Sequence, residues 1–104
     1  MTLSQIKYFL AVCEQKSFTN AARCSAVSQP SLSGAIKALE SELGSTLFTR
    51  RPRALPTSIG SALQPYFQSI IEAADKTREV AQRIRERNTP HTSARSAKVV
   101  SFVK

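Results

Sequence analysis

The sequence is poor in the residue types on which several common classes of protein depend. It has two cysteines, three glycines and no tryptophan among its 104 residues. Cys13 and Cys24 lack the Cys-x-x-Cys spacing of zinc and redox sites, and the N-terminal residues lack the charged and then apolar pattern of a secretory signal. These absences favour a reducing compartment, and we expect a cytoplasmic protein.

The residues that catalysis would need are equally scarce. His91 is the one histidine, neither cysteine has a paired base, and the sequence has no glycine-rich loop that could hold a phosphate. No apolar run approaches the roughly 20 residues that span a bilayer. We therefore expect a protein that is not an enzyme, has no cofactor or metal, and does not insert into a membrane.

Acidic residues are outnumbered by basic ones. The chain has 15 Lys and Arg against seven Asp and Glu, a formal charge of +8 and a pI near 10.2. Such a balance favours a polyanionic partner, with nucleic acid ahead of an anionic membrane. Positive charge is concentrated in residues 49–60, which contain three arginines and no acidic residue.

Two short helices are predicted near the N-terminus. Between Leu3 and Cys13 apolar residues recur at helical spacing, which indicates an amphipathic helix over residues 3–15. Ser17 to Asn20 can cap a second helix that ends near Ser25. Ala26 and Val27 then form a turn.

A third helix follows, with Ser28 as its cap, Pro30 in its first turn and Gly44 at its end. A short helix, a turn and a second capped helix form a helix-turn-helix, whose second helix reads bases in the major groove. The side facing away from the expected core would bind DNA; it contains Ser28, Gln29, Pro30, Ser31, Ser33, Gly34 and Lys37. The simpler alternative is a solvated polar face, although a glycine in mid-helix costs about 1 kcal/mol relative to alanine.

Two short strands, 47–49 and 55–57, are predicted to pair around an arginine-rich loop, as in the wing of a winged helix. Arg50, Arg51 and Arg53 in this loop can bind phosphates or enter the adjacent minor groove. Their alternative role is solubility.

From Ser58 to about Asn88 the pattern is helical, with apolar positions spaced alternately by four and three residues. Four heptads predict a coiled-coil seam, and a rod of about 45 Å would be too long for a small domain to cover. The seam consists of Ile59, Leu63, Tyr66, Ile70, Ala73, Thr77, Val80 and Ile84. The sequence thus predicts a mainly α protein: a winged helix-turn-helix domain (1–58) with a short β-hairpin wing, a long C-terminal coiled-coil linker helix for dimerisation (59–88), and a basic tail (89–104).

Several ordered motifs agree with one known family. They are Ser17-Phe18-Thr19-Asn20-Ala21-Ala22, Val27-Ser28-Gln29-Pro30-Ser31-Leu32-Ser33, Ile36, Leu39-Glu40, Glu42-Leu43-Gly44, Leu47-Phe48-Thr49-Arg50, Pro56-Thr57 and Gly60. Over roughly residues 1–88 the chain resembles the N-terminal domain of LysR-type transcriptional regulators.

The resemblance implies a bacterial regulator whose linker helices pair antiparallel into dimers, which commonly assemble into tetramers that contact promoter DNA at two places. It also implies that Gln29, Pro30, Ser33 and Gly34 face the DNA groove, with Arg50 and Arg53 near the DNA backbone.

The sequence departs from the family pattern at three points. Ser25 stands where the family usually has an apolar residue, and Gly34 where it often has a larger polar or basic one. Only 16 residues follow Asn88, so we expect no effector-binding domain and no small-molecule effector for this chain. The tail is expected to be disordered, or to contain in residues 99–103 the stub of that domain's first strand, in a fragment or a natural short protein.

The function predicted from the sequence is specific binding of promoter double-stranded DNA as a homodimer, with tetramer formation possible through a full-length form. One alternative is a short interaction protein that pairs with a full-length regulator through the linker helix. A second is a nonspecific nucleoid-coating protein, which would not need a capped recognition helix. An RNA-stacking module is disfavoured, because Phe9, Phe18 and Phe48 are expected to pack in the core.

Overall fold

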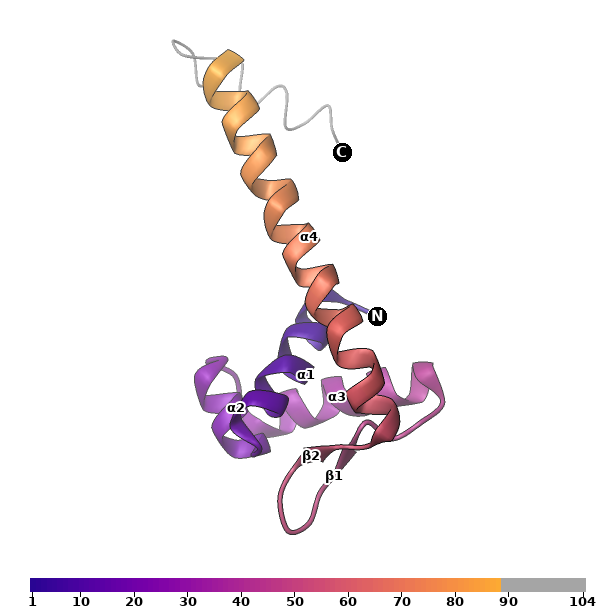
Figure 1. The fold of residues 1–104 in the computed structure, drawn as a ribbon. Helices are drawn as coiled ribbons and strands as arrows, with labels where there is room; N and C mark the ends of the chain where they lie inside the picture. The colour runs from indigo at the N-terminus through magenta and orange to yellow at the C-terminus, as the bar shows by residue number, and fades with distance from the viewer. Residues whose placement is uncertain (89–104) are drawn as a thin grey trace. The chain divides into compact units, whose positions relative to one another are not determined.

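The computed structural model describes residues 1–88. Within that range the chain is mainly helical, with four helices and one two-stranded hairpin, which confirms the predicted fold class (Figure 1). The elements are α1 (Leu3–Gln15), α2 (Phe18–Cys24), α3 (Gln29–Leu43), β1 (Phe48–Thr49), β2 (Leu55–Pro56) and α4 (Ser58–Asn88). The predicted basic tail, including the strand stub at residues 99–103, lies outside the described residues.

The helix boundaries follow local capping signals. The Ser17 hydroxyl accepts the Asn20 N–H at 3.1 Å, and the Ser28 hydroxyl accepts the Ser31 N–H at 3.2 Å. At the other end of α3, Gly44 has the left-handed conformation with φ 75°, which glycine adopts without steric cost. These three predicted helix ends are confirmed.

The hairpin is shorter than the sequence pattern suggests. β1 and β2 pair antiparallel, with Phe48 opposite Pro56 and Thr49 opposite Leu55. Leu47 and Thr57 lie just outside this ladder, although the Leu47 carbonyl still accepts the Thr57 N–H at 2.9 Å. The five residues between the strands, 50–54, form the wing loop.

Aromatic rings join the helices to the hairpin. Phe9 of α1 is fully buried, and its ring centre lies 5.1 Å from that of Phe48 and 4.8 Å from that of Phe67. The ring centre of Phe18 lies 5.7 Å from that of Phe48. Phe9 and Phe48 are buried and Phe18 packs against the same cluster, so the expectation that these rings form core is confirmed.

The chain divides into two compact units, and the first one extends beyond the predicted boundary at residue 58. It comprises residues 1–71, and the described part of the second is 72–88. The first unit is larger because the beginning of α4 completes its core. Gly60 and Phe67 are buried there, while Leu63 and Ile71 are partly buried against the same cluster.

Candidate nucleic-acid interface

Helices α2 and α3 are joined by a tight turn. Ala26 has φ 57° in this turn, and the Val27 N–H donates to the Ala22 carbonyl at 3.0 Å. A left-handed alanine costs roughly 1–2 kcal/mol, so the packing of the two helices must hold this conformation in place. The buried alanines Ala21 and Ala22 leave room for that packing. The segment therefore has the helix-turn-helix order that the sequence predicts.

Helix α3 has one buried and one exposed side. Leu32, Ile36 and Leu39 are buried in the core. All the residues predicted to bind DNA on this helix lie on the other side: Ser28, Gln29, Pro30, Ser31, Gly34 and Lys37 are exposed, and Ser33 is half-buried. The placement of these seven residues is therefore compatible with a recognition surface.

Two side-chain hydrogen bonds organise the start of α3. The Ser28 hydroxyl donates to the Ser31 hydroxyl at 2.9 Å, and Gln29 Nε2 donates to the Ser33 hydroxyl at 2.7 Å. An amide has two N–H donors and one carbonyl. Since Ser33 takes one donor, Gln29 keeps one donor and one acceptor, which is the set that a bidentate contact with adenine uses.

The three wing arginines differ in their surroundings. Arg50 donates from Nη1 to the Phe48 carbonyl at 3.2 Å and from Nη2 to Glu40 Oε1 at 3.4 Å. Arg51 and Arg53 are exposed, and their guanidinium groups make no hydrogen bond or ion pair with residues 1–88. Arg50 thus makes contacts within the protein although its side chain is 43% exposed, whereas the guanidinium groups of the other two make none within residues 1–88.

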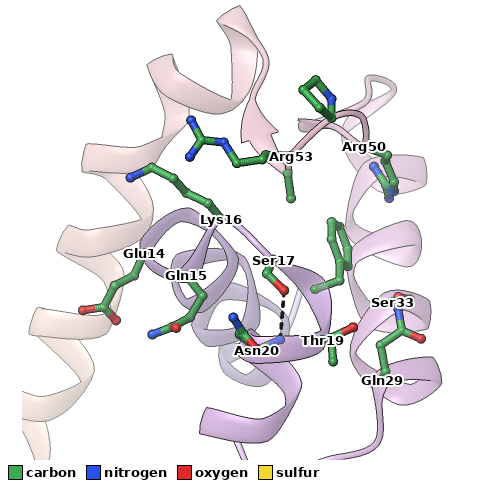
Figure 2. Close-up of a pocket in the computed structure, with 13 residues that line it drawn as sticks. Glu14, Gln15, Lys16, Ser17, Thr19, Asn20, Gln29, Ser33, Arg50 and Arg53 are labelled. Atoms are coloured by element: carbon green, nitrogen blue, oxygen red, sulfur yellow. Dashed lines mark hydrogen bonds between the residues drawn. The ribbon is translucent and has the colours of Figure 1, made fainter.

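A hollow of about 710 Å³ lies between α3 and the wing (Figure 2). Gln29 and Ser33 contribute from α3, and Arg50 and Arg53 from the wing. The remaining lining side chains include Glu14, Gln15, Lys16, Ser17, Thr19 and Asn20, from the end of α1 and the beginning of α2. The structure therefore brings two of the predicted surfaces together around one concavity.

Lys16, Thr19 and Asn20 are part of this surface although the sequence pattern does not predict it. The pattern of residues 17–20 indicates capping, and Ser17 does cap α2. The position of Lys16 follows from its left-handed backbone, φ 56°, which ends α1, and from its carbonyl, which accepts the Ala54 N–H at 3.4 Å. That long-range bond places the end of α1 beside the wing and has no signature in the sequence.

Within the first unit, the predicted seam residues of α4 differ in their exposure to solvent. Ile59 and Ile70 are each 38% exposed, and Tyr66 is 68% exposed. Leu63 is instead partly buried against the core of its own unit. In the second unit Ala73, Thr77 and Ile84 are exposed, and Val80 is partly buried.

The cysteines and acidic residues give no sign of a chemical site in the described range. Burial raises the pKa of the Cys13 thiol to about 11, so this thiol stays protonated and unreactive at neutral pH. Residues 1–88 contain no cluster of His, Cys, Asp and Glu suited to a metal ion. No helix in the same range is long and apolar enough to cross a bilayer.

The chain matches one family model over most of the residues described above. The model described as a bacterial regulatory helix-turn-helix protein of the lysR family matches residues 3–61. Among curated relatives, the transcriptional regulator IlvR of Caulobacter vibrioides is 35% identical over 94 residues, covering 89% of this chain and 32% of the relative. The transcriptional regulator BudR of Klebsiella aerogenes is 39% identical over 85 residues, covering 81% of this chain and 59% of the relative.

A solved structure also has the same fold. The BenM DNA-binding domain, in complex with catB site 1 DNA, superposes with a TM-score of 0.78 at 35% identity, covering 81% of this chain and 96% of that one. The chain spans less than two thirds of the length of the relatives IlvR and BudR. Those relatives are transcriptional regulators and not enzymes. The chain therefore belongs to the LysR family of bacterial regulatory helix-turn-helix proteins, and the matched residues 3–61 form its DNA-binding domain.

Proposed function

We propose that this chain is a transcriptional regulator that binds specific promoter DNA as a homodimer. In this proposal α3 enters the major groove and the wing contacts the flanking backbone. The observation that carries the proposal is the position of Gln29, Ser33 and Arg53, which line one hollow although they come from different elements. A duplex bound there would meet a polar helix and a cationic loop at the same time.

The two sides of the hollow differ in what they can recognise. Gln29 has the donor and acceptor that discriminate adenine in the major groove. Arg51, Arg53 and Lys37 are exposed cations, which favour phosphate oxygens and carry no sequence information directly. We assign specificity to the start of α3 and most of the sequence-independent affinity to the wing.

The proposed partner is double-stranded DNA, and the proposed location is the bacterial cytoplasm, where promoter DNA lies. The structurally similar BenM domain was solved with DNA bound, which supports the choice of a duplex over RNA. The burial of Phe9 and Phe48 supports the same choice, because buried rings cannot stack on unpaired bases.

The proposed dimer uses the exposed apolar side chains of α4. Ile59, Tyr66 and Ile70 are large hydrophobic side chains exposed to solvent in a chain with a net charge of +8. Such exposure favours a partner surface, and a second copy of α4 supplies a matching one. A tetramer with a full-length form would be assembled from the same dimers bound to DNA. The alternative function is pairing of α4 with a full-length regulator.

Selection from a pool of random duplexes, followed by footprinting of the purified chain alone, tests this proposal. We expect enrichment of one sequence with two half-sites, and protection of both by the homodimer. If the chain enriches no sequence and protects none without a full-length regulator, the interaction-protein function replaces this one. Equal affinity for selected and random DNA would instead indicate nonspecific coating.

Gln29→Ala tests the assignment of specificity. Removal of a bidentate interaction with a base should cost about 1–3 kcal/mol at the selected sequence and leave random-DNA affinity nearly unchanged. Gln82→Ala is a matched control, because Gln82 is also an exposed helical glutamine with a hydrogen bond four residues on, to Glu86 at 3.1 Å. Equal decreases in affinity for selected and random DNA would show that Gln29 does not read sequence.

A further inference from the structure

The base of the wing is attached to the helix-turn-helix through one arginine. Arg50 directly follows β1, and its guanidinium contacts Glu40 of α3 and the carbonyl of Phe48. Its Cζ also lies 4.6 Å from the centre of the ring of Phe18, the first residue of α2. One side chain thus touches both helices of the helix-turn-helix and the first strand of the wing.

Glu40 makes this attachment specific. It is only 8% exposed, so its carboxylate needs partners to offset the loss of water. Oε2 accepts the Leu47 N–H at 2.7 Å, and Oε1 pairs with Arg50 at 3.4 Å. Because Leu47 precedes β1 and Arg50 follows it, one carboxylate of α3 holds both ends of the strand.

These contacts use the guanidinium group of Arg50, whereas those of Arg51 and Arg53 have no such partners within residues 1–88. The guanidinium directs one nitrogen to a carboxylate and another to a backbone carbonyl, with an aromatic ring against its face. Binding a phosphate by the same groups would require breaking the ion pair next to a largely buried carboxylate. The exposed arginines at positions 51 and 53 face no such cost.

We propose that Arg50 is a positioning residue, which fixes the wing relative to the recognition helix α3 and contributes to DNA affinity through the placement of Arg51 and Arg53. This inference rests on the proposed function. A wing held in place loses less conformational freedom on binding, so the ion pair with Glu40 strengthens DNA binding without touching DNA.

Glu40→Gln separates this role from direct binding of a phosphate. Glutamine retains an oxygen for the Leu47 N–H but removes the ion pair with Arg50. If Arg50 positions the wing, Glu40→Gln and Arg50→Ala each weaken binding roughly three- to tenfold, and the double variant is no weaker than the worse single one. If Arg50 binds phosphate, Glu40→Gln leaves affinity unchanged or tightens it, because a negative charge near DNA is removed.

The salt dependence and a conservative variant give a second discrimination. The slope of log K against log salt is negative, and each phosphate that a protomer no longer neutralises reduces its magnitude by about 0.9. We expect Arg53→Ala, the matched control, to show that decrease, and Arg50→Ala to keep the wild-type slope. Arg50→Lys retains charge but not the planar fork, so it should behave like Arg50→Ala. A reduced slope in Arg50→Ala together with normal binding by Arg50→Lys would overturn the proposal.

Hydrogen exchange of the wing amides, those of Arg50, Arg51, Arg53 and Ala54, measures positioning in the absence of DNA. Exchange should be faster in Glu40→Gln and Arg50→Lys than in wild type, while Arg51→Ala and Arg53→Ala leave it unchanged. Circular dichroism identifies any variant that fails to fold. Unchanged wing exchange in folded Glu40→Gln overturns the proposal even if the wild-type chain binds no DNA, so its failure is distinguishable from failure of the proposed function.

Discussion

Gly34 of α3 and Gly60 of α4 illustrate how differently one residue type can be used. A Cβ at Gly34 would meet no atom within 4 Å, whereas a Cβ at Gly60 would collide with the backbone carbonyl oxygen of Leu47. Gly60 is therefore required for α4 to pack closely against the hairpin. No contact within the described chain requires a glycine at position 34.

We expect the two alanine variants to move stability in opposite directions. Gly34→Ala should stabilise the fold by about 1 kcal/mol, because alanine is the better helix former. Gly60→Ala should destabilise it by roughly 1–3 kcal/mol, as overpacking does. Urea unfolding measures both. A destabilised Gly34→Ala would contradict the open surroundings of this position, and weaker DNA binding by a stabilised one would support close approach of α3 to a duplex.

The two thiols should also differ. Cys24 is exposed, whereas burial raises the pKa of Cys13 to about 11. Alkylation requires the thiolate, so a limiting amount of iodoacetamide at neutral pH should modify Cys24 first. Peptide mass analysis after denaturation gives the two extents of reaction, with Cys24→Ser protein as the control. Faster modification of Cys13 than of Cys24 would contradict its burial.

At the scale of elements, the wing is a short hairpin whose loop contains exposed positive charges. Arg51 and Arg53 both lie in the exposed loop. Changing both to alanine should weaken binding to selected and random DNA together. The magnitude of the negative slope of log K against log salt should decrease by about 0.9 for each phosphate that a protomer no longer binds.

A matched pair on α4 controls for the removal of charge itself. Arg78 and Arg83 are exposed and pair with Asp75 and Glu79 on the same helix. Arg78→Ala with Arg83→Ala removes the same net charge from residues outside the wing and should leave the slope close to wild type. A larger decrease in affinity for the selected sequence than for random DNA, in the wing variant, would show instead that a wing arginine reads a narrow minor groove.

Helix α4 also has two roles along its first turns. Phe67 is buried in the core of the first unit, whereas Tyr66 and Ile70 are exposed. One side of the helix is therefore buried in the core of the first unit, and other apolar side chains of the same helix are exposed to solvent. Those exposed side chains are what the proposed dimer would cover.

At the scale of the whole molecule, self-association is the property to test. Ile70→Asp places a charge in the middle of the proposed seam, and burying it unpaired is costly. Because Ile70 is 38% exposed in the single chain, the monomer should tolerate the change. Sedimentation at tens of micromolar should show a dimer for wild type and a shift towards monomer for Ile70→Asp.

Ser69→Asp adds the same charge one position away, at an exposed residue outside the seam, and should remain dimeric. A wild-type chain that sediments as a monomer would remove the homodimer from the proposal. Dissociation of both variants alike would show that added charge, and not the seam, controls assembly.

The sequence alone determined those features whose signals are local. Helix α3 begins after Ser28 and ends at Gly44 because a hydroxyl cap and a left-handed glycine act within one turn of the helix. Its buried and exposed sides follow from the spacing of Leu32, Ile36 and Leu39. The exposure of the side that we propose as the recognition surface could be predicted for the same reason.

Only the tertiary structure decided the contacts between residues far apart in the chain. Heptad spacing marks Leu63 as a seam residue, but packing against the core places it with Phe67, and the first unit consequently ends at Ile71 and not at residue 58. Arg50 resembles the other cations of the wing until the fold brings Glu40 to its side, ten residues away. Periodicity predicts which residues are buried. It does not predict which residues they contact, because those contacts depend on how the elements pack together.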